Sequence, residues 1–260
     1  DAPENKRLQH LIEHKPALFS RIDAKVNIHF KHEEEDKIDF NLQRTLPHKF
    51  TQSGPGLSVG DVNGDGLEDF IIGGSTGYSP YIYTQRSDGT FVGAKKQARD
   101  ENKREEDEGL LLFDADGDGD SDLYVVSGSI ESPEKEIFQD RLYLNNGKGD
   151  FSLSSSSLPE TTASGSCVRA ADYDGDGDLD LFVGGRVVTG SYPTPASSYV
   201  LRNDRGKFLD VTNEVNADLQ HLGMVTDALW TDFNNDNKVD LIVVGEFMPI
   251  TVFANEGGKL

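Results

Sequence analysis

The sequence predicts an all-β fold built from four copies of one unit. Three observations lead to this prediction: an acidic loop recurs four times, short runs of branched and aromatic residues flank every copy, and helical periodicity is missing from all four copies. The four loops span 61–69, 114–122, 172–180 and 232–240. One such loop arises easily by chance, whereas four loops in register with their flanks indicate a repeat.

Each copy contains four strand candidates in a fixed order around its loop. The first strand precedes the loop, at 56–59, 110–113, 167–170 and 228–231. The second follows it, at 70–72, 123–126, 181–183 and 241–244, and the third lies at 81–83, 142–144, 199–201 and 251–253. A glycine-bearing turn then leads to a fourth strand that begins at Phe91, Phe151, Phe208 or Leu260. Short β-rich runs separated by Gly, Asn and Asp turns are typical of antiparallel sheets.

Four strands in a unit of roughly 50–60 residues make one blade of a β-propeller. We therefore predict a propeller, or a propeller segment, over 17–260, with a calcium loop between strands 1 and 2 of each four-stranded blade. The blades are expected near 51–93, 109–153, 166–212 and 227–260. Residues 1–16 are expected to form a short helix or linker.

Closure of the propeller requires further strands, because an open sheet edge invites aggregation. The fourth copy only begins its last strand, at Leu260. Candidates for closing strands lie within 17–50, where Val26, Ile28 and Phe30 alternate, as do Ile38, Phe40 and Leu42. We also expect further blades beyond one or both ends. Since the first residue is Asp1, we expect a processed piece whose export signal lies outside it.

The loops have the chemistry of a calcium site. Positions 1, 3, 5 and 9 are Asp or Asn, and position 7 can offer its backbone carbonyl, which gives an all-oxygen ligand set suited to a hard cation. Positions 4 and 6 are Gly or Asn, which tolerate the left-handed backbone that a tight loop needs. The predicted ligands of about four ions are Asp61, Asn63, Asp65, Leu67, Asp69, Asp114, Asp116, Asp118, Asp120, Asp122, Asp172, Asp174, Asp176, Asp178, Asp180, Asp232, Asn234, Asp236, Lys238 and Asp240.

Two other interpretations of the loops are weaker. An EF-hand needs Glu at position 12 and helical flanks, whereas that position is Ile72, Val125, Val183 or Val243 and the flanks are strand candidates. Metal-free Asp-Gly turns would leave converging carboxylates that repel one another. The second and third loops have Asp at all four side-chain positions, while Asn63 and Asn234 replace one Asp in the others. We expect the weakest binding in the fourth loop, which also has Asn in place of both glycines.

Composition excludes some functions. The chain has 46 acidic and 25 basic residues, a formal charge of −21, which repels nucleic acid. No apolar run approaches the length of a membrane helix. Cys167 is the only cysteine, so no intramolecular disulfide can form; we expect it to be buried.

The loops and their flanks resemble FG-GAP/VCBS repeats, the calcium-loop blades also found in integrin α-subunit propellers. Stretches 46–56, 140–146, 184–188 and 223–249 resemble the bacterial VCBS-repeat proteins related to cartilage acidic protein, which are associated with ASPIC/UnbV segments. No such segment is visible in this chain. The resemblance spans about 17–260 and implies a secreted or surface-attached, calcium-binding, non-enzymatic propeller.

In a propeller blade the long 2–3 and 4–1 connections share the face opposite the metal loops, and binding residues concentrate on such connections. The sequence therefore predicts a recognition face there, for a protein or polysaccharide partner at the cell surface. Candidate ligand-binding residues are Tyr78, Arg141, Arg186, Tyr192, Glu246 and Phe247.

We predict no enzyme activity. The alternatives are a propeller-type polysaccharide lyase or hydrolase, and a structural subunit of an outer-envelope complex. His10-Leu-Ile-Glu-His14 matches a zinc-peptidase pattern, but on a short terminal segment that ends before Pro16 we interpret it as a surface helix. The G-x-S-x-G match at 73–77 is not expected to be a nucleophile elbow, because no helix candidate follows it.

Overall fold

The computed structural model describes residues 18–93 and 99–260. The helix or linker predicted at 1–16, including the His10–His14 pattern, lies outside the described residues. Within the described ranges, fifteen strands form four antiparallel sheets in which sequential strands are neighbours. No helix in the described part of the chain is long and apolar enough to cross a membrane.

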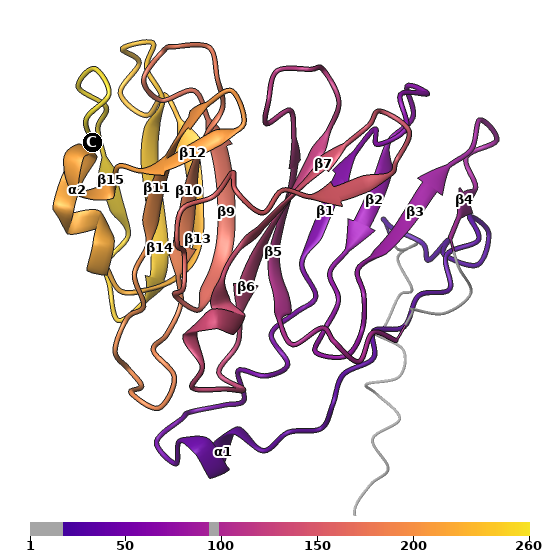
Figure 1. The fold of residues 1–260 in the computed structure, drawn as a ribbon, viewed down its shortest axis with the longest axis horizontal. Helices are drawn as coiled ribbons and strands as arrows, with labels where there is room; N and C mark the ends of the chain where they lie inside the picture. The colour runs from indigo at the N-terminus through magenta and orange to yellow at the C-terminus, as the bar shows by residue number, and fades with distance from the viewer. Residues whose placement is uncertain (1–17, 94–98) are drawn as a thin grey trace, which may run out of the picture.

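The sheets follow the predicted repeats (Figure 1). The first contains β1 (Leu57–Gly60), β2 (Asp69–Ile72), β3 (Tyr81–Gln85) and β4 (Phe91–Val92), and the second β5 (Glu106–Phe113), β6 (Asp122–Gly128), β7 (Arg141–Asn145) and β8 (Phe151–Leu153). The third contains β9 (Gly165–Ala171), β10 (Asp180–Gly185), β11 (Tyr199–Asp204) and β12 (Lys207–Asp210), and the fourth β13 (Met224–Thr231), β14 (Asp240–Glu246) and β15 (Thr251–Phe253). The all-β fold of four-stranded, propeller-like blades is thus confirmed for three sheets. The fourth has three strands, in agreement with the sequence analysis, in which the last strand of this copy only begins.

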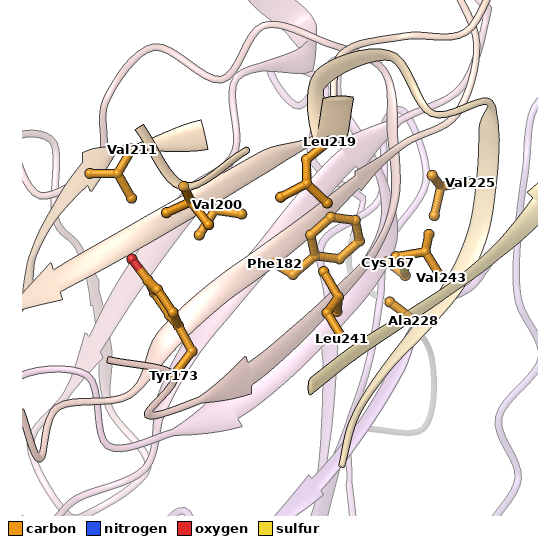
Figure 2. Packing of buried hydrophobic residues seen from close by; sticks show 11 residues of the cluster. Cys167, Tyr173, Phe182, Val200, Val211, Leu219, Val225, Ala228, Leu241 and Val243 are labelled. Carbon is orange, nitrogen blue, oxygen red and sulfur yellow. The ribbon is translucent and has the colours of Figure 1, made fainter. Parts of the chain in front are cut away.

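The blades stack face to face with their first strands side by side, since β1 contacts β5, β5 contacts β9 and β9 contacts β13. Apolar residues of facing sheets fill the space between them. Figure 2 shows the cluster between the third and fourth sheets, where Phe182 lies beside Leu241 and Leu219. Cys167 is buried in the same cluster, as expected. The four sheets do not close into a ring within the described residues.

Short helices occupy the connections. They are α1 (Asp39–Leu42), η1 (Lys135–Phe138), α2 (Thr212–Asn216) and η2 (Ala217–His221). Leu219 of η2 is fully buried, so this turn caps the core between the third and fourth sheets.

The closing strands expected within 17–50 are not formed in the described part of that segment. Ile28 and Phe30 instead pack over the outer face of the first sheet, near Tyr81 and Tyr83. The alternation that resembled a strand serves this contact. Val26 adds a single backbone bond, its carbonyl accepting from the Phe91 amide at 2.9 Å.

The second candidate strand is replaced by α1 because a buried carboxylate fixes the backbone there. Asp39 accepts hydrogen bonds from the amides of Phe50 and Thr51 and from the Thr51 hydroxyl, at 2.5, 3.0 and 2.7 Å. Asp39 is buried, whereas Ile38 and Leu42 are 56% and 49% exposed. The polar residue, rather than the apolar ones, therefore faces inward.

An asparagine at or just after the end of the third strand joins each of the second, third and fourth blades to the blade before it. The Asn203 side-chain amide donates to the Ala115 carbonyl of the preceding blade's loop at 2.8 Å and to the Leu179 carbonyl at 3.2 Å. Its carbonyl oxygen accepts from the Gly206 amide at 2.8 Å. Asn145 and Asn255 bond the Val62 and Tyr173 carbonyls in the same way.

We expect Asn203→Ala to lower the free energy of unfolding by about 2–4 kcal/mol, because it leaves buried carbonyls and an amide without partners. Urea denaturation measures this change. Asn146→Ala is the matched control, since the Asn146 side chain bonds only exposed groups of its own turn. Equal effects of the two substitutions would contradict a role for Asn203 in joining the blades.

Candidate metal loops and the face opposite them

The backbone of each acidic loop has the curled conformation that the sequence predicted. Positions 4 and 6 have positive φ in all four loops; in the fourth loop they are Asn235 at 62° and Asn237 at 64°. The loops are flanked by strands, so the EF-hand interpretation is wrong. Both ends of each loop are fixed in a sheet, because the loop joins the first and second strands, which pair with each other.

The first carboxylate organises each loop. In the third loop, Asp172 accepts the amides of Gly175 and Gly177 at 2.8 and 3.1 Å. Asp174 then accepts the Asp176 amide at 3.2 Å. The chain therefore curls around its own acidic side chains.

Two of the loops bring three carboxylates together. Asp114, Asp116 and Asp122 form one cluster and Asp172, Asp174 and Asp176 the other, each with one oxygen per residue within 4.8 Å of the others. Such all-oxygen clusters fit a hard divalent cation. They lie in the second and third loops, the two with the highest count of Asp. In the fourth loop Asn234 donates its amide to Asp236 at 3.1 Å.

The last Asp of each loop has a structural role that the sequence did not indicate. Asp122 is fully buried and accepts the Ala115 amide at 3.0 Å and the Asn145 amide at 2.8 Å. Asp69, Asp180 and Asp240 make the equivalent pairs of bonds. This residue therefore joins the loop to the end of the third strand, whether or not it also contacts an ion.

Several carboxyl groups of the loops have a pKa above its ordinary value. Burial raises the pKa of Asp122 to about 6 and that of Asp180 to about 7; bonds from backbone amides oppose this rise, while neighbouring loop carboxylates add to it. Burial and adjacent carboxylates also raise the pKa of Asp116 and Asp174. A bound cation would lower these pKa values, because it favours the charged form of each carboxyl group.

This gives a prediction for pH dependence. Because the folded pKa values of Asp122 and Asp180 lie above their ordinary values, the folded chain binds more protons than the unfolded chain between about pH 4 and 7. Without divalent ions, the free energy of unfolding should fall as the pH rises through this window. Calcium competes with those protons. The difference in the free energy of unfolding between calcium and chelator should therefore grow as the pH rises through the same window. A constant difference would contradict protonation of the loops.

Four of the six candidate recognition residues lie together on the face opposite the loops. Arg186 pairs with Glu246 at 2.7 Å and places its guanidinium 5.0 Å from the centre of the Phe50 ring. Tyr192 lies edge-on to both Phe50 and Phe247, with ring centres 5.9 and 5.8 Å apart. Phe247 is 68% exposed. We call Arg186, Tyr192, Glu246 and Phe247 the aromatic–arginine cluster.

The other two candidates lie elsewhere. Arg141 donates to the buried Asp107 at 2.6 Å and to Ser127 at 3.2 Å. Tyr78 pairs with Arg99 through an isolated backbone bridge. In the 73–77 motif, Ser75 is buried and donates to the Glu33 carbonyl, and no helix follows, so the structure has no nucleophile elbow there.

Sequence reasoning missed a cavity of about 360 Å³ beside this cluster. Glu108, Ser166 and Thr226 line it together with Arg186 and Phe50. The first three occupy the same position in their repeats, at equal distance before the first loop Asp. That shared register is the only sequence signal of the cavity, and the differing residue types conceal it.

Comparison with known proteins supports the repeat assignment. An FG-GAP-like repeat profile matches residues 61–125 and 114–183. Human cartilage acidic protein 1 is 27% identical over 213 residues, covering 81% of this chain and 31% of the relative. The mouse protein is 28% identical over 216 residues, with 81% and 32% covered. The chain thus spans about a third of the length of these curated relatives.

Two solved structures are similar at lower identity. A lectin of Agrocybe aegerita that recognises non-reducing terminal N-acetylglucosamine has a TM-score of 0.49 and 22% identity, covering 77% of this chain and 49% of the lectin. The V. cholerae biofilm matrix protein Bap1 has a TM-score of 0.33 and 17% identity, covering 79% of this chain and 29% of Bap1.

Proposed function

From the premise that the chain carries FG-GAP-like repeats and is a distant homologue of cartilage acidic protein 1, we propose that it is a calcium-stabilised, non-catalytic binding module. It works outside the cell or on the outer cell surface, secreted or lipid-anchored. The aromatic–arginine cluster engages a protein or polysaccharide partner.

The observation that supports this function best is the convergence of three carboxylates in each of two rigid loops. Oxygen-lined sites of this kind in extracellular modules bind calcium with dissociation constants of about 10⁻⁴–10⁻³ M. Such sites fill only where the calcium concentration is high, as it is outside the cell. The ions stiffen the turns at one end of the blades.

The aromatic–arginine cluster supports the binding role. Exposed aromatic side chains and arginine are enriched among residues that dominate binding energy. Phe247 is exposed, and Tyr192 and Arg186 are held in place behind it by Phe50 and Glu246. A cluster prearranged in this way loses little side-chain freedom when a partner binds.

We expect Tyr192→Ala and Phe247→Ala each to weaken partner binding about 10-fold or more, the loss typical of central aromatic residues. The measurement is an affinity pull-down from native membranes in calcium and in chelator, followed by titration of the recovered partner. Phe233→Ala is the matched control, because Phe233 is 61% exposed but belongs to a metal loop on the opposite face.

Two outcomes would contradict the proposal. Equal binding by all three variants would separate recognition from the aromatic–arginine cluster. Turnover of uronic-acid polymers by the purified chain would favour the polysaccharide lyase instead.

A further inference from the structure

The cavity beside the aromatic–arginine cluster is built by one irregularity that recurs in three blades. The first strands β5, β9 and β13 each contain an extra residue that has no partner in the strand ladder, namely Glu108, Ser166 and Thr226. These bulged residues line the cavity, at the strand ends away from the metal loops. β-Bulges commonly redirect a side chain toward a functional site.

The hydroxyl groups of the wall present acceptors to the cavity. Ser164 donates to the Ser129 carbonyl at 2.6 Å, Ser166 to the Val225 carbonyl at 2.7 Å and Thr226 to the Val244 carbonyl at 3.3 Å. A hydroxyl has one hydrogen and two lone pairs. Because backbone carbonyls take the hydrogens, only the lone pairs remain for a ligand.

The Glu108 side chain makes no hydrogen bond within the described residues. Burial and the neighbouring carboxylates of Glu106 and Glu34 raise its pKa to about 8. Arg186 is the cation that acts on it, but that guanidinium donates to Glu246 at 2.7 Å and to the Met224 carbonyl at 3.2 Å. Lys49 also lines the cavity, but its ammonium group donates to Asp36 at 2.9 Å. A ligand that supplies donors and positive charge would favour the charged Glu108 carboxylate over its protonated form.

We propose that the cavity binds the primary ammonium group of an amino sugar, with Glu108 as its counter-ion and the bulged hydroxyls as further acceptors. An ammonium group has three donors and no acceptor, which complements this wall. The net charge of −21 also attracts a cation. The inference extends the binding role proposed above by naming a ligand class.

Size and shape favour a sugar over the side chain of a partner's lysine. The volume of about 360 Å³ is wider than an unbranched alkyl chain requires and lies in the range of small-ligand sites. The Arg186 guanidinium at the same cavity supplies donors for sugar hydroxyls.

The test is calorimetric titration of the purified chain, in saturating calcium, with methyl glucosaminide, its N-acetyl derivative and methyl glucoside. We expect the amine to bind about 10- to 100-fold more tightly than either neutral sugar, the range of one charge-assisted hydrogen-bonding contact. Glu108→Gln should remove that preference, and Thr226→Val should reduce it several-fold. Glu136→Gln, an exposed carboxylate on η1, should leave it unchanged.

Equal affinity for the three sugars, or a preference that survives Glu108→Gln in a variant with unchanged thermal unfolding, would overturn the proposal. Binding of Nα-acetyl-lysine amide as tight as that of methyl glucosaminide would also overturn it and indicate a protein partner. The metal loops are tested separately, by the effect of calcium on unfolding. If calcium did not stabilise the chain but Glu108-dependent binding were intact, the proposed calcium role would be contradicted and this inference would not.

Discussion

Saturating calcium should raise the free energy of unfolding of this chain by about 5 kcal/mol relative to chelator. A ligand at 100 times its dissociation constant stabilises the folded state by about 2.7 kcal/mol per site, and two loops hold three convergent carboxylates each. The unfolded chain cannot hold those carboxylates together, so the binding energy favours the folded state. Urea denaturation in calcium and in chelator measures the difference.

The two loops can be assigned by substitution. Asp116→Asn together with Asp174→Asn should reduce the calcium effect, because each removes one charge from a cluster while keeping an oxygen ligand. Asp204→Asn, an exposed residue outside the loops, should leave the effect unchanged. Calorimetric titration showing four equal sites, or tightest binding in the fourth loop, would contradict our ranking of the loops.

Asp107→Asn should lower the free energy of unfolding by about 3–5 kcal/mol, as expected when one member of a buried ion cluster is removed. The Asp107 carboxylate is fully buried and accepts from Lys103 at 3.1 Å, from Arg141 at 2.6 Å and from the Gly74 amide at 2.7 Å. Without its charge, two largely buried cations lose their counter-ion. This cluster ties the 99–105 connection between the first and second blades to the sheets.

A double-variant cycle separates this effect from loss of packing. Adding Lys103→Met to Asp107→Asn should recover part of the stability, because one uncompensated cation is then removed. Glu101→Gln is the control, since its pairing with Arg99 at 3.8 Å is exposed, and its effect should stay within about 0.5 kcal/mol. Equal losses for Asp107→Asn and Glu101→Gln would show that the buried charges are not coupled.

The repeat structure was predictable because its signals are local. Alternating β-rich runs, Gly and Asn at the turns, and acids at fixed positions each act within one hairpin, and β1 to β15 follow their predicted order. The prediction failed at 17–50, where strand-like alternation is present. There the outcome depends on contacts with distant residues, such as Phe30 with Tyr81 and Asp39 with Thr51.

The candidate site shows the same division. The acidic loops could be located from the sequence, but the sequence did not show which of their carboxylates converge. The cluster of the second loop includes the last Asp of that loop, Asp122, whereas the cluster of the third loop includes Asp176 instead. Arg186 and Arg141 looked alike as candidates. Only packing distinguishes them, because Arg186 lies beside Phe50 on the face opposite the loops while Arg141 pairs with a buried carboxylate.

The sequence by itself determined the all-β repeat, the order of the strands and the all-oxygen chemistry of the loops, since backbone preference and residue type act over a few neighbouring positions. The tertiary structure alone decided the path of the N-terminal segment, the asparagine contacts between blades and the cavity around Glu108. These features join residues from different blades, and their energies exist only after the sheets have packed against one another.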